Sequence, residues 1–201
     1  GPWAVRIPTL VAMLLTVTLI YIYSRTFLSE LGAFTAGASF ATFAQVLELG
    51  RLGETEGLFT LFVAGGLLLW KTGLNRGWSL WTVWCVGYGF CALAVLTKGP
   101  QAPPYFIVPV CFYLILTRNW KVFFSPAHAV GIFLAASIIA AWQVPFAQQV
   151  GASESWKIYF RDVGPRFFDL SLKTVATHMA TFPLELILGA LLPWSFLYFC
   201  Y

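Results

Sequence analysis

"PTLVAMLLTVTLIYIYS", Pro8 to Ser24, contains no charged side chain over 17 consecutive positions. A helix rises about 1.5 Å per residue, so a run of this kind approaches the length that crosses ~30 Å of hydrocarbon. Its residues do not alternate between polar and apolar, as the strands of a membrane barrel do. The stretch therefore predicts a membrane-spanning helix.

The rest of the chain has the same character. Its 201 residues are 59% hydrophobic and only 10% charged, and the mean hydropathy is +0.78. A soluble domain of this size cannot bury so much apolar surface, and a chain in lipid must satisfy its backbone polar groups internally. We therefore predict an all-α integral membrane protein, a polytopic helical bundle. Its seven expected spans are residues 8–24, 32–49, 57–70, 79–97, 104–117, 127–147 and 180–201.

The charged residues of the loops give a predicted orientation. Loops after the first, third and fifth spans hold Arg25, Lys71, Arg76, Arg118 and Lys121, with Glu30 as their acid. An excess of basic residues marks the cytoplasmic side. The N-terminus, residues 50–57, residues 98–104 and an interfacial loop at about 148–179 then share the outer face. The net charge of +4 lies between spans, which favours lipid headgroups over nucleic acid as the partner.

The outer-face stretch "GRLGETEG", Gly50 to Gly57, concentrates charge. If the second span stays helical, Glu48, Arg51 and Glu54 are three residues apart and can pair. Glu56 lies about 140° around the helix from Arg51 and points elsewhere. Two readings stay open. One is a salt-bridged helix end, and the other is a polar pocket in which acids bind a metal or a sugar and arginine binds phosphate.

Two further outer-face segments could contact an anionic ligand. Lys98 precedes Gly99-Pro100, which is expected to end a helix, and its ammonium could either snorkel to the interface or bind phosphate. The long loop interleaves aromatic residues with cations, among them Arg161 and Arg166. That pattern is typical of a helix lying on the membrane, and it also suits a lipid-phosphate headgroup.

Titratable residues near the last span complete the candidates. His178 is a weak metal-ligand candidate, because no H-x-x-x-H or H-E-x-x-H spacing supports it. Glu185 is an intramembrane carboxylate, and such groups are functional candidates by default. His128 follows a Ser-Pro pair and is expected in a cytoplasmic loop. The four cysteines lie in apolar runs and are interpreted as packing residues.

The order of these motifs resembles a known family. "RIP" at 6–8 is followed by "LGRLGETEGLFTLFV" at 49–63, "LAVLTKGP" at 93–100, His178 and "LLPWS" at 191–195. This order is similar to the bacterial relatives of protein O-mannosyltransferases, the polytopic GT-C glycosyltransferases that include lipid A aminoarabinose transferases. The resemblance implies that a sugar moves, with inversion, from a polyprenyl-phosphate donor to a lipid or protein acceptor. It places the active side on the periplasmic face of the bacterial inner membrane.

The resemblance also implies roles for individual residues. The family has a carboxylate, usually aspartate, five residues after an arginine; Glu56 occupies that position after Arg51. Glu56 and Glu54 are therefore the predicted catalytic acids. The predicted contacts to the donor phosphate are Arg6, Arg51, Lys98, Arg161 and Arg166. No cofactor is certain, and a divalent cation is the alternative ligand of the acids.

The extent of the chain is a further expectation. We expect one transmembrane glycosyltransferase-like domain over residues 1–201, truncated at both ends, because the last apolar run reaches Tyr201 without a polar flank. The family's main catalytic carboxylate lies in a loop before the "RIP" span and would precede Gly1. A transporter or flippase of lipid-linked sugars, or a non-catalytic membrane relative, is the alternative. A transporter predicts polar groups near the bilayer midplane, whereas most polar groups here lie near span ends.

Overall fold

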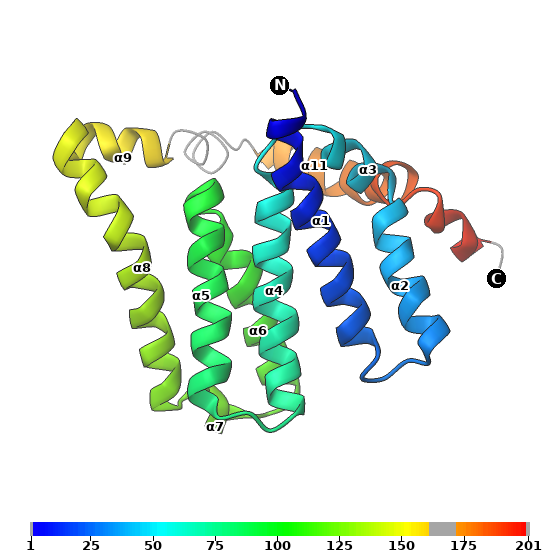
Figure 1. The fold of residues 1–201 in the computed structure, drawn as a ribbon, viewed down its shortest axis with the longest axis horizontal. Helices are drawn as coiled ribbons and strands as arrows, with labels where there is room; N and C mark the ends of the chain where they lie inside the picture. Colours follow the sequence, from blue (N-terminus) through cyan, green and yellow to red (C-terminus); the bar gives the residue numbers. More distant parts are fainter. Residues whose placement is uncertain (1, 161–171, 200–201) are drawn as a thin grey trace. The chain divides into compact units, whose positions relative to one another are not determined.

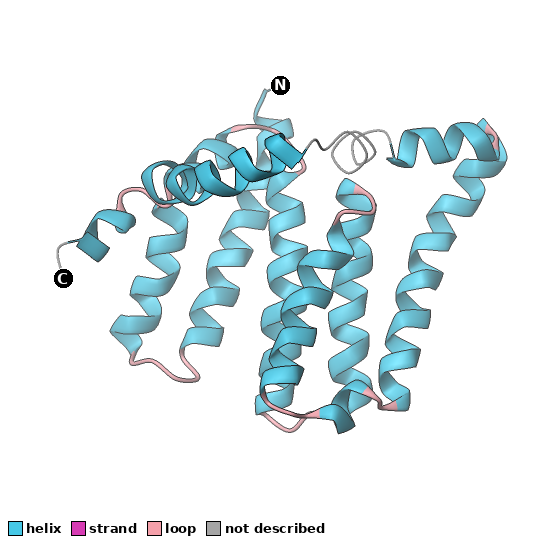
Figure 2. Ribbon diagram, turned by 180° about the vertical axis from the view of Figure 1, so that it is seen from behind, coloured by secondary structure: helices cyan, strands magenta, loops and turns pink. Residues whose placement is uncertain are grey.

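The computed structural model describes residues 2–160 and 172–199, and no strand occurs among them (Figure 2). The helices follow one another along the chain as α1 (Pro2–Ser24), α2 (Glu30–Thr42), α3 (Ala44–Arg51), α4 (Glu56–Asn75), α5 (Leu80–Lys98), α6 (Ala102–Leu116), α7 (Trp120–Phe123), α8 (Pro126–Val150), α9 (Ala152–Phe160) and α11 (Leu172–Glu185). A π-helical turn, Leu186–Ala190, and a 3-10 helix, Trp194–Phe199, come after α11. Figure 1 shows their arrangement.

Four helices of the described part are long and apolar enough to cross a membrane. They are Arg6–Ser24, Glu56–Asn75, Leu80–Lys98 and Pro126–Val150, with mean hydropathies of 1.9, 1.5, 1.7 and 1.8. Large apolar side chains on their surfaces face outward; Phe133 on α8, for example, is 74% exposed. In water such exposure would be costly, whereas in lipid it is favourable. The predicted all-α integral membrane fold is confirmed.

Two of the seven predicted spans are not single helices. The span predicted over 32–49 is interrupted at Phe43, whose ψ of 136° is extended, so that α2 ends and α3 begins there. The span predicted over 180–201 changes from α11 to the π-helical turn and then to the 3-10 helix. A further predicted span, α6, has only 15 residues.

The described residues form two compact units. The first comprises the described part of 1–58 and 164–201, and the second is 59–160. In the first unit α1 and α2 run antiparallel and pack closely, with Gly37 against Val17 (Figure 1). After the break at Phe43, α3 returns to the end of the unit where α1 begins. This geometry brings residues near positions 6 and 51 together.

The second unit packs α5 against α8 and α6 around aromatic side chains. Trp70, Trp84 and Phe106 are almost completely buried there. His128 lies in the first turn of α8 rather than in the predicted loop, and its ring stacks on Trp84 with centroids 4.0 Å apart. Its Nε2 lies 2.7 Å from the Tyr88 hydroxyl. The prediction failed because tertiary contacts, which sequence does not show, hold this half-buried ring against Trp84 and Tyr88.

Close approach of α5 and α8 requires a glycine at position 131, and this gives the first testable prediction. A Cβ there would lie 2.7 Å from Tyr88 Cδ2 and 3.0 Å from the Trp84 backbone oxygen. Overpacking of this kind costs about 1–3 kcal/mol, so Gly131→Ala should lower the Tm by roughly 5 °C. The matched control is Gly89→Ala on α5, where a Cβ meets nothing within 4 Å. Alanine favours helix, so this control should hold or raise the Tm; equal Tm values would contradict the packing argument.

Candidate functional site

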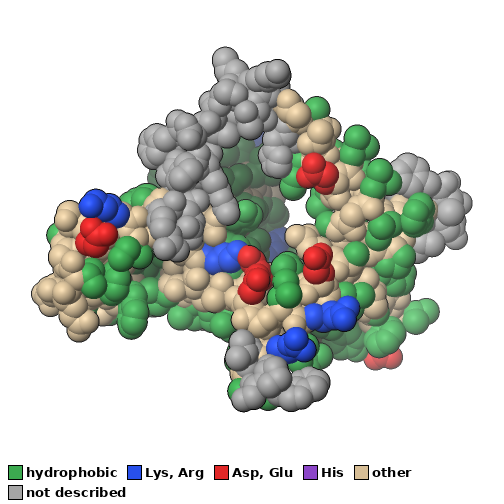
Figure 3. Space-filling model, turned by 90° about the horizontal axis from the view of Figure 1, so that it is seen from above, with side chains coloured by type: hydrophobic (Ala, Val, Ile, Leu, Met, Phe, Trp, Pro, Cys, Tyr) green, Lys and Arg blue, Asp and Glu red, His purple; other side chains and the backbone are tan. Residues whose placement is uncertain are grey.

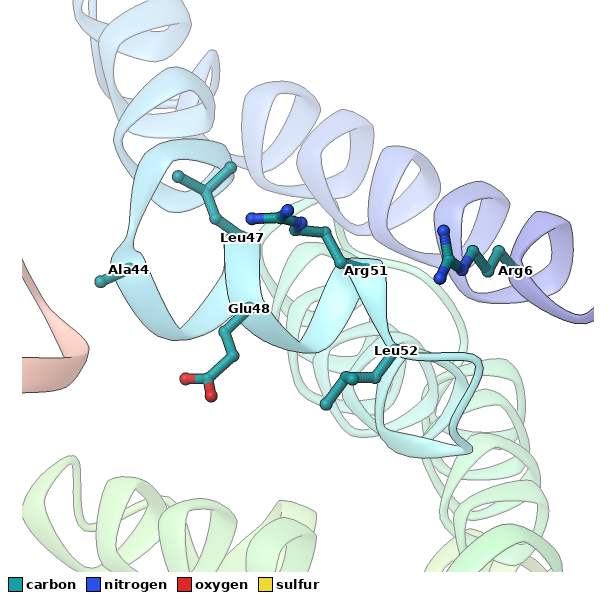
Figure 4. A pocket seen from close by; sticks show the side chains of 6 residues that line it. All are labelled: Arg6, Ala44, Leu47, Glu48, Arg51 and Leu52. Atoms are coloured by element: carbon teal, nitrogen blue, oxygen red, sulfur yellow. The ribbon is translucent and has the colours of Figure 1, made fainter. Parts of the chain in front are cut away.

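An open cleft of about 480 Å³ lies in the first unit, where α3 passes the N-terminal part of α1 (Figure 4). It is lined by Arg6, Ala44, Leu47, Glu48, Arg51 and Leu52. The lining therefore contains two guanidinium groups and one carboxylate, beside alanine and leucine side chains. The balance of charge is positive.

Arg6 and Arg51 come from different helices and approach the cleft from two sides. Arg51 occupies the last turn of α3, where a cation interacts favourably with the partial negative charge of the helix C-terminus. Figure 4 shows the Arg51 side chain running back along α3 toward Leu47, while the guanidinium of Arg6 projects from α1 toward α3. Both residues are exposed, so a ligand can reach their donors.

Glu48 lines the same cleft, but its carboxylate points away from Arg51 (Figure 4). The ion pairs among the described residues do not include Glu48 with Arg51. The predicted stripe of Glu48, Arg51 and Glu54 is wrong for a second reason. Helix α3 ends at Arg51 and Leu52 is extended, with φ −82° and ψ 138°, so Glu54 has left the helix. The salt-bridged helix end is therefore not what the structure contains.

Glu54 lies in the turn that joins α3 to α4, and Glu56 follows directly after this turn. Glu54 is exposed, and its backbone carbonyl accepts a hydrogen bond of 2.9 Å from the hydroxyl of Thr9 on α1. Glu56 is the first residue of α4, where a carboxylate is stabilised by the positive end of the helix dipole. Its side chain is half-buried. Glu56 is thus separated from Glu48 and Arg51 on α3 by a turn, and not by its position around one continuous helix.

Lys98 belongs to the second unit and ends α5, as the Gly99-Pro100 pair predicts. Gly99 has a φ of +79° and donates its backbone N–H to Val95 O, so it caps the helix in a conformation suited to glycine. Lys98 is half-buried as a residue, and its ammonium lies 5.7 Å from the centroid of the Phe59 ring. Phe59 in turn contacts Tyr105 edge to face.

Helix α9 packs on the same end of the second unit. Gly151, with a φ of +91°, ends α8 and lets the chain turn into α9. Gln143 of α8 donates a hydrogen bond of 2.7 Å to Ser155, and Tyr159 packs against the buried cluster of Ala94, Val95 and Ala102 near the end of α5. Burial raises the pKa of Tyr159 above its ordinary value, so the phenol stays neutral at physiological pH. The short helix predicted in the long loop is present, while its position in the membrane interface stays a prediction.

The remaining candidates divide between described and undescribed residues. Arg161 and Arg166 lie outside the described residues, as does the side chain of His178, whose backbone is in α11. Glu185 is the exposed last residue of α11. In the described part of the chain, no three His, Cys, Asp or Glu side chains form a group that could hold a metal ion.

Sequence reasoning missed Thr9 and Gly57, which hold the turn against α1. Thr9 is only 2% exposed. A Cβ on Gly57 would lie 2.7 Å from Thr9 Cγ2, so this helix start fits directly against α1. A single threonine in an apolar run carries no signal of such a contact, which joins residues 45 positions apart.

Comparison with known proteins shows the family of the chain. The sequence model of a family described as dolichyl-phosphate-mannose-protein mannosyltransferase matches residues 1–144, which include the cleft, Glu54, Glu56 and Lys98. No curated protein and no solved structure shows significant similarity to the chain.

Proposed function

The chain belongs to the dolichyl-phosphate-mannose-protein mannosyltransferase family, and from that premise we propose that it transfers a sugar from a polyprenyl-phosphate carrier to a lipid or protein acceptor. The family makes it a membrane glycosyltransferase. The proposal itself adds five points: the polyprenyl-phosphate carrier, the acceptor class, the GT-C type, inversion at the anomeric carbon, and a location on the periplasmic face of the bacterial inner membrane.

The observation that carries the proposal is the pair of arginines at one cleft. Guanidinium groups present planar sets of donors that match phosphate oxygens, and two of them from different helices can hold one phosphate from two sides. Arg6 and Arg51 line a cleft of about 480 Å³ with an excess of positive charge. The leucines of the same lining, Leu47 and Leu52, offer an apolar surface to the first carbons of a lipid tail.

The reaction follows from this chemistry. A hydroxyl of the acceptor attacks the anomeric carbon, the bond from that carbon to the phosphate oxygen breaks, and the carrier phosphate leaves with the electron pair. Negative charge grows on the leaving phosphate, where Arg6 and Arg51 stabilise it. Glu56, with Glu54 as its neighbour in the turn, orients the acceptor and takes up its proton or holds a divalent cation. Lys98 is also proposed to contact the donor phosphate, because its "TKGP" motif matches that of the family.

A transport assay and a transfer assay on the same vesicles test the proposal. The protein is reconstituted with a polyprenyl-phosphate sugar carrying a radiolabel on the sugar, and an acceptor extract is added on one side. We expect labelled acceptor to accumulate together with free polyprenyl phosphate. Donor that changes leaflet without losing its sugar would instead identify a flippase, and neither event would indicate a non-catalytic relative.

A further inference from the structure

The turn that contains Glu54 and leads into Glu56 is held to α1 at one residue. Thr9 lies on α1, three positions after Arg6, and its side chain is 2% exposed. Its hydroxyl donates to the Glu54 carbonyl at 2.9 Å. That carbonyl has left the helical ladder, because α3 ends at Arg51 and α4 begins at Glu56. The bond therefore ties the backbone of the turn to α1.

Thr9 also makes a close steric contact with Gly57, the second residue of α4. A Cβ on Gly57 would lie 2.7 Å from Thr9 Cγ2 and 3.1 Å from the Thr9 backbone oxygen. The first turn of α4 thus fits against α1 only because position 57 has no side chain. Thr9 therefore contacts this segment in two ways. Its hydroxyl holds the Glu54 carbonyl, and its methyl group and backbone limit how closely the start of α4 can approach α1.

These two contacts affect how far the charged groups of Arg51 and Glu56 lie from that of Arg6. Arg6 is one turn from Thr9 on α1, whereas Arg51 and Glu56 flank the turn that Thr9 holds. We propose that Thr9 is a positioning residue: by holding the turn to α1, it sets where Arg51 and Glu56 lie relative to Arg6. This role rests on the proposed function. Thr9 touches no reacting atom in this scheme and acts through the geometry of the two arginines and the acid.

The test compares Thr9→Val with Thr9→Ser in the full chain, in lipid nanodiscs. Valine keeps the shape of the side chain and removes the donor, while serine keeps the donor. Since a displacement of about 1 Å can cost up to ~100-fold in rate, Thr9→Val should lower kcat/KM by about 10- to 100-fold, and binding of polyprenyl phosphate should weaken as well. Thr9→Ser should stay within about threefold of wild type.

Thr16→Val is the matched control, because it removes a buried threonine hydroxyl from the same helix. Thr16 is 0% exposed and donates only to Ala12 O, within α1, at 2.9 Å. It should leave kcat/KM within about threefold. Hydrogen–deuterium exchange of residues 52–58 gives a readout independent of activity. Exchange there should accelerate in Thr9→Val and remain unchanged in Thr16→Val.

A suppressor pair tests the steric contact even if Thr9→Val folds poorly. Gly57→Ala should lower activity about tenfold or more, because its Cβ meets Thr9. Thr9→Ser removes the methyl group that makes the 2.7 Å contact, so the double variant should recover several-fold over Gly57→Ala. A double variant no better than Gly57→Ala would overturn this contact as the means of positioning.

The remaining outcomes separate this role from the proposed function. Faster exchange in Thr9→Val with unchanged binding and turnover would make Thr9 structural only and overturn the proposal. Unchanged exchange would show that the hydrogen bond does not hold the turn. If wild type itself failed to bind polyprenyl phosphate, the proposed function and this role would both fall, while the exchange difference would still report the hydrogen bond.

Discussion

Replacing Arg51 with alanine is expected to lower kcat/KM for a polyprenyl-phosphate sugar by about 100- to 1,000-fold, the loss typical of one removed oxyanion donor. The expectation follows from its place on the cleft that Arg6 also lines. Charge develops on the leaving phosphate during transfer, so the loss should be larger in kcat than in the binding of polyprenyl phosphate. The measurement is steady-state transfer from a radiolabelled donor at several donor concentrations.

The variant Arg51→Lys distinguishes the effect of the positive charge from the effect of the planar guanidinium. Arg51→Lys keeps the positive charge but loses the planar fork, so its activity should fall between wild type and Arg51→Ala. Arg76→Ala is the matched control, since Arg76 is an exposed arginine immediately after α4 and at a distance in sequence from every cleft residue. It should retain activity within about twofold.

A variant in which Arg6 and Arg51 are both replaced by alanine tests whether the two arginines bind the same anion. If Arg6 and Arg51 bind the same phosphate, removing both should cost less than the sum of the two single losses in free energy, because contacts to a shared group are not additive. Fully additive losses would mean separate roles. Activity of Arg51→Ala equal to that of Arg76→Ala would remove the cleft from the mechanism.

The helix ends show what a sequence can predict in this chain. Gly99-Pro100 ends α5 at Lys98 as expected, because a glycine with positive φ and a proline act locally. Apolar run length likewise identifies the four long helices. These features depend on residues within a few positions of one another, which is why they are readable from the sequence.

The break at Phe43 could not be predicted in the same way. No glycine or proline marks it, and its new helix start is satisfied from far away in the chain. The Ala44 N–H donates to Leu192 O at 2.8 Å, and the Trp194 indole donates to the Thr42 hydroxyl at 2.6 Å. The free N–H groups of a helix start need such partners. A break held by residues about 150 positions away leaves no local pattern.

The same distinction applies to the candidate site. Sequence motifs identified Arg6, Arg51 and Glu56 as candidates, and the structure places Arg6 and Arg51 on one cleft. The pairing of Glu48, Arg51 and Glu54 was wrong because it assumed an unbroken helix, whereas α3 ends at Arg51. Arg51 is the last residue of α3, and Glu54 beyond it is held to α1 by its backbone carbonyl instead of by its side chain.

The exposed surface bears on where substrate approaches. In the space-filling view, acidic and basic side chains are exposed among hydrophobic ones on the face shown (Figure 3). Mixed charge of this kind is costly in hydrocarbon and suits a face in contact with water or headgroups. This holds for each unit by itself, and it agrees with the proposal that the carrier phosphate is bound at the headgroup level.

Replacing Glu56 with glutamine is the second large expected effect, about 100-fold or more in kcat, because positioned acid–base groups typically contribute 10²–10⁴-fold. Glutamine keeps the size and a hydrogen-bond acceptor but cannot take up a proton at neutral pH. The KM for the donor should change little, since the phosphate is assigned to the arginines. The measurement is the initial rate of transfer at saturating donor with the acceptor concentration varied.

Two comparisons distinguish the carboxylate from its surroundings. Glu56→Asp restores the residue type usual in the resembled family and should recover most of the activity that Glu56→Gln loses. Glu54→Gln should have the smaller effect of the two acids, because the turn uses the Glu54 backbone carbonyl and leaves its side chain exposed. Glu30→Gln, on an exposed acid paired with Arg25 at 3.2 Å, serves as the control for loss of a surface carboxylate.

The pattern across these variants decides what Glu56 does. A loss in Glu56→Gln that is confined to kcat and reversed by aspartate would identify the carboxylate as the group that receives the acceptor proton. A loss relieved by added divalent cation would instead assign Glu56 to a metal, since a weakened ligand set is compensated by mass action. Full activity in Glu56→Gln, with Glu54→Gln impaired, would transfer the catalytic role to Glu54 and make the start of α4 a structural element.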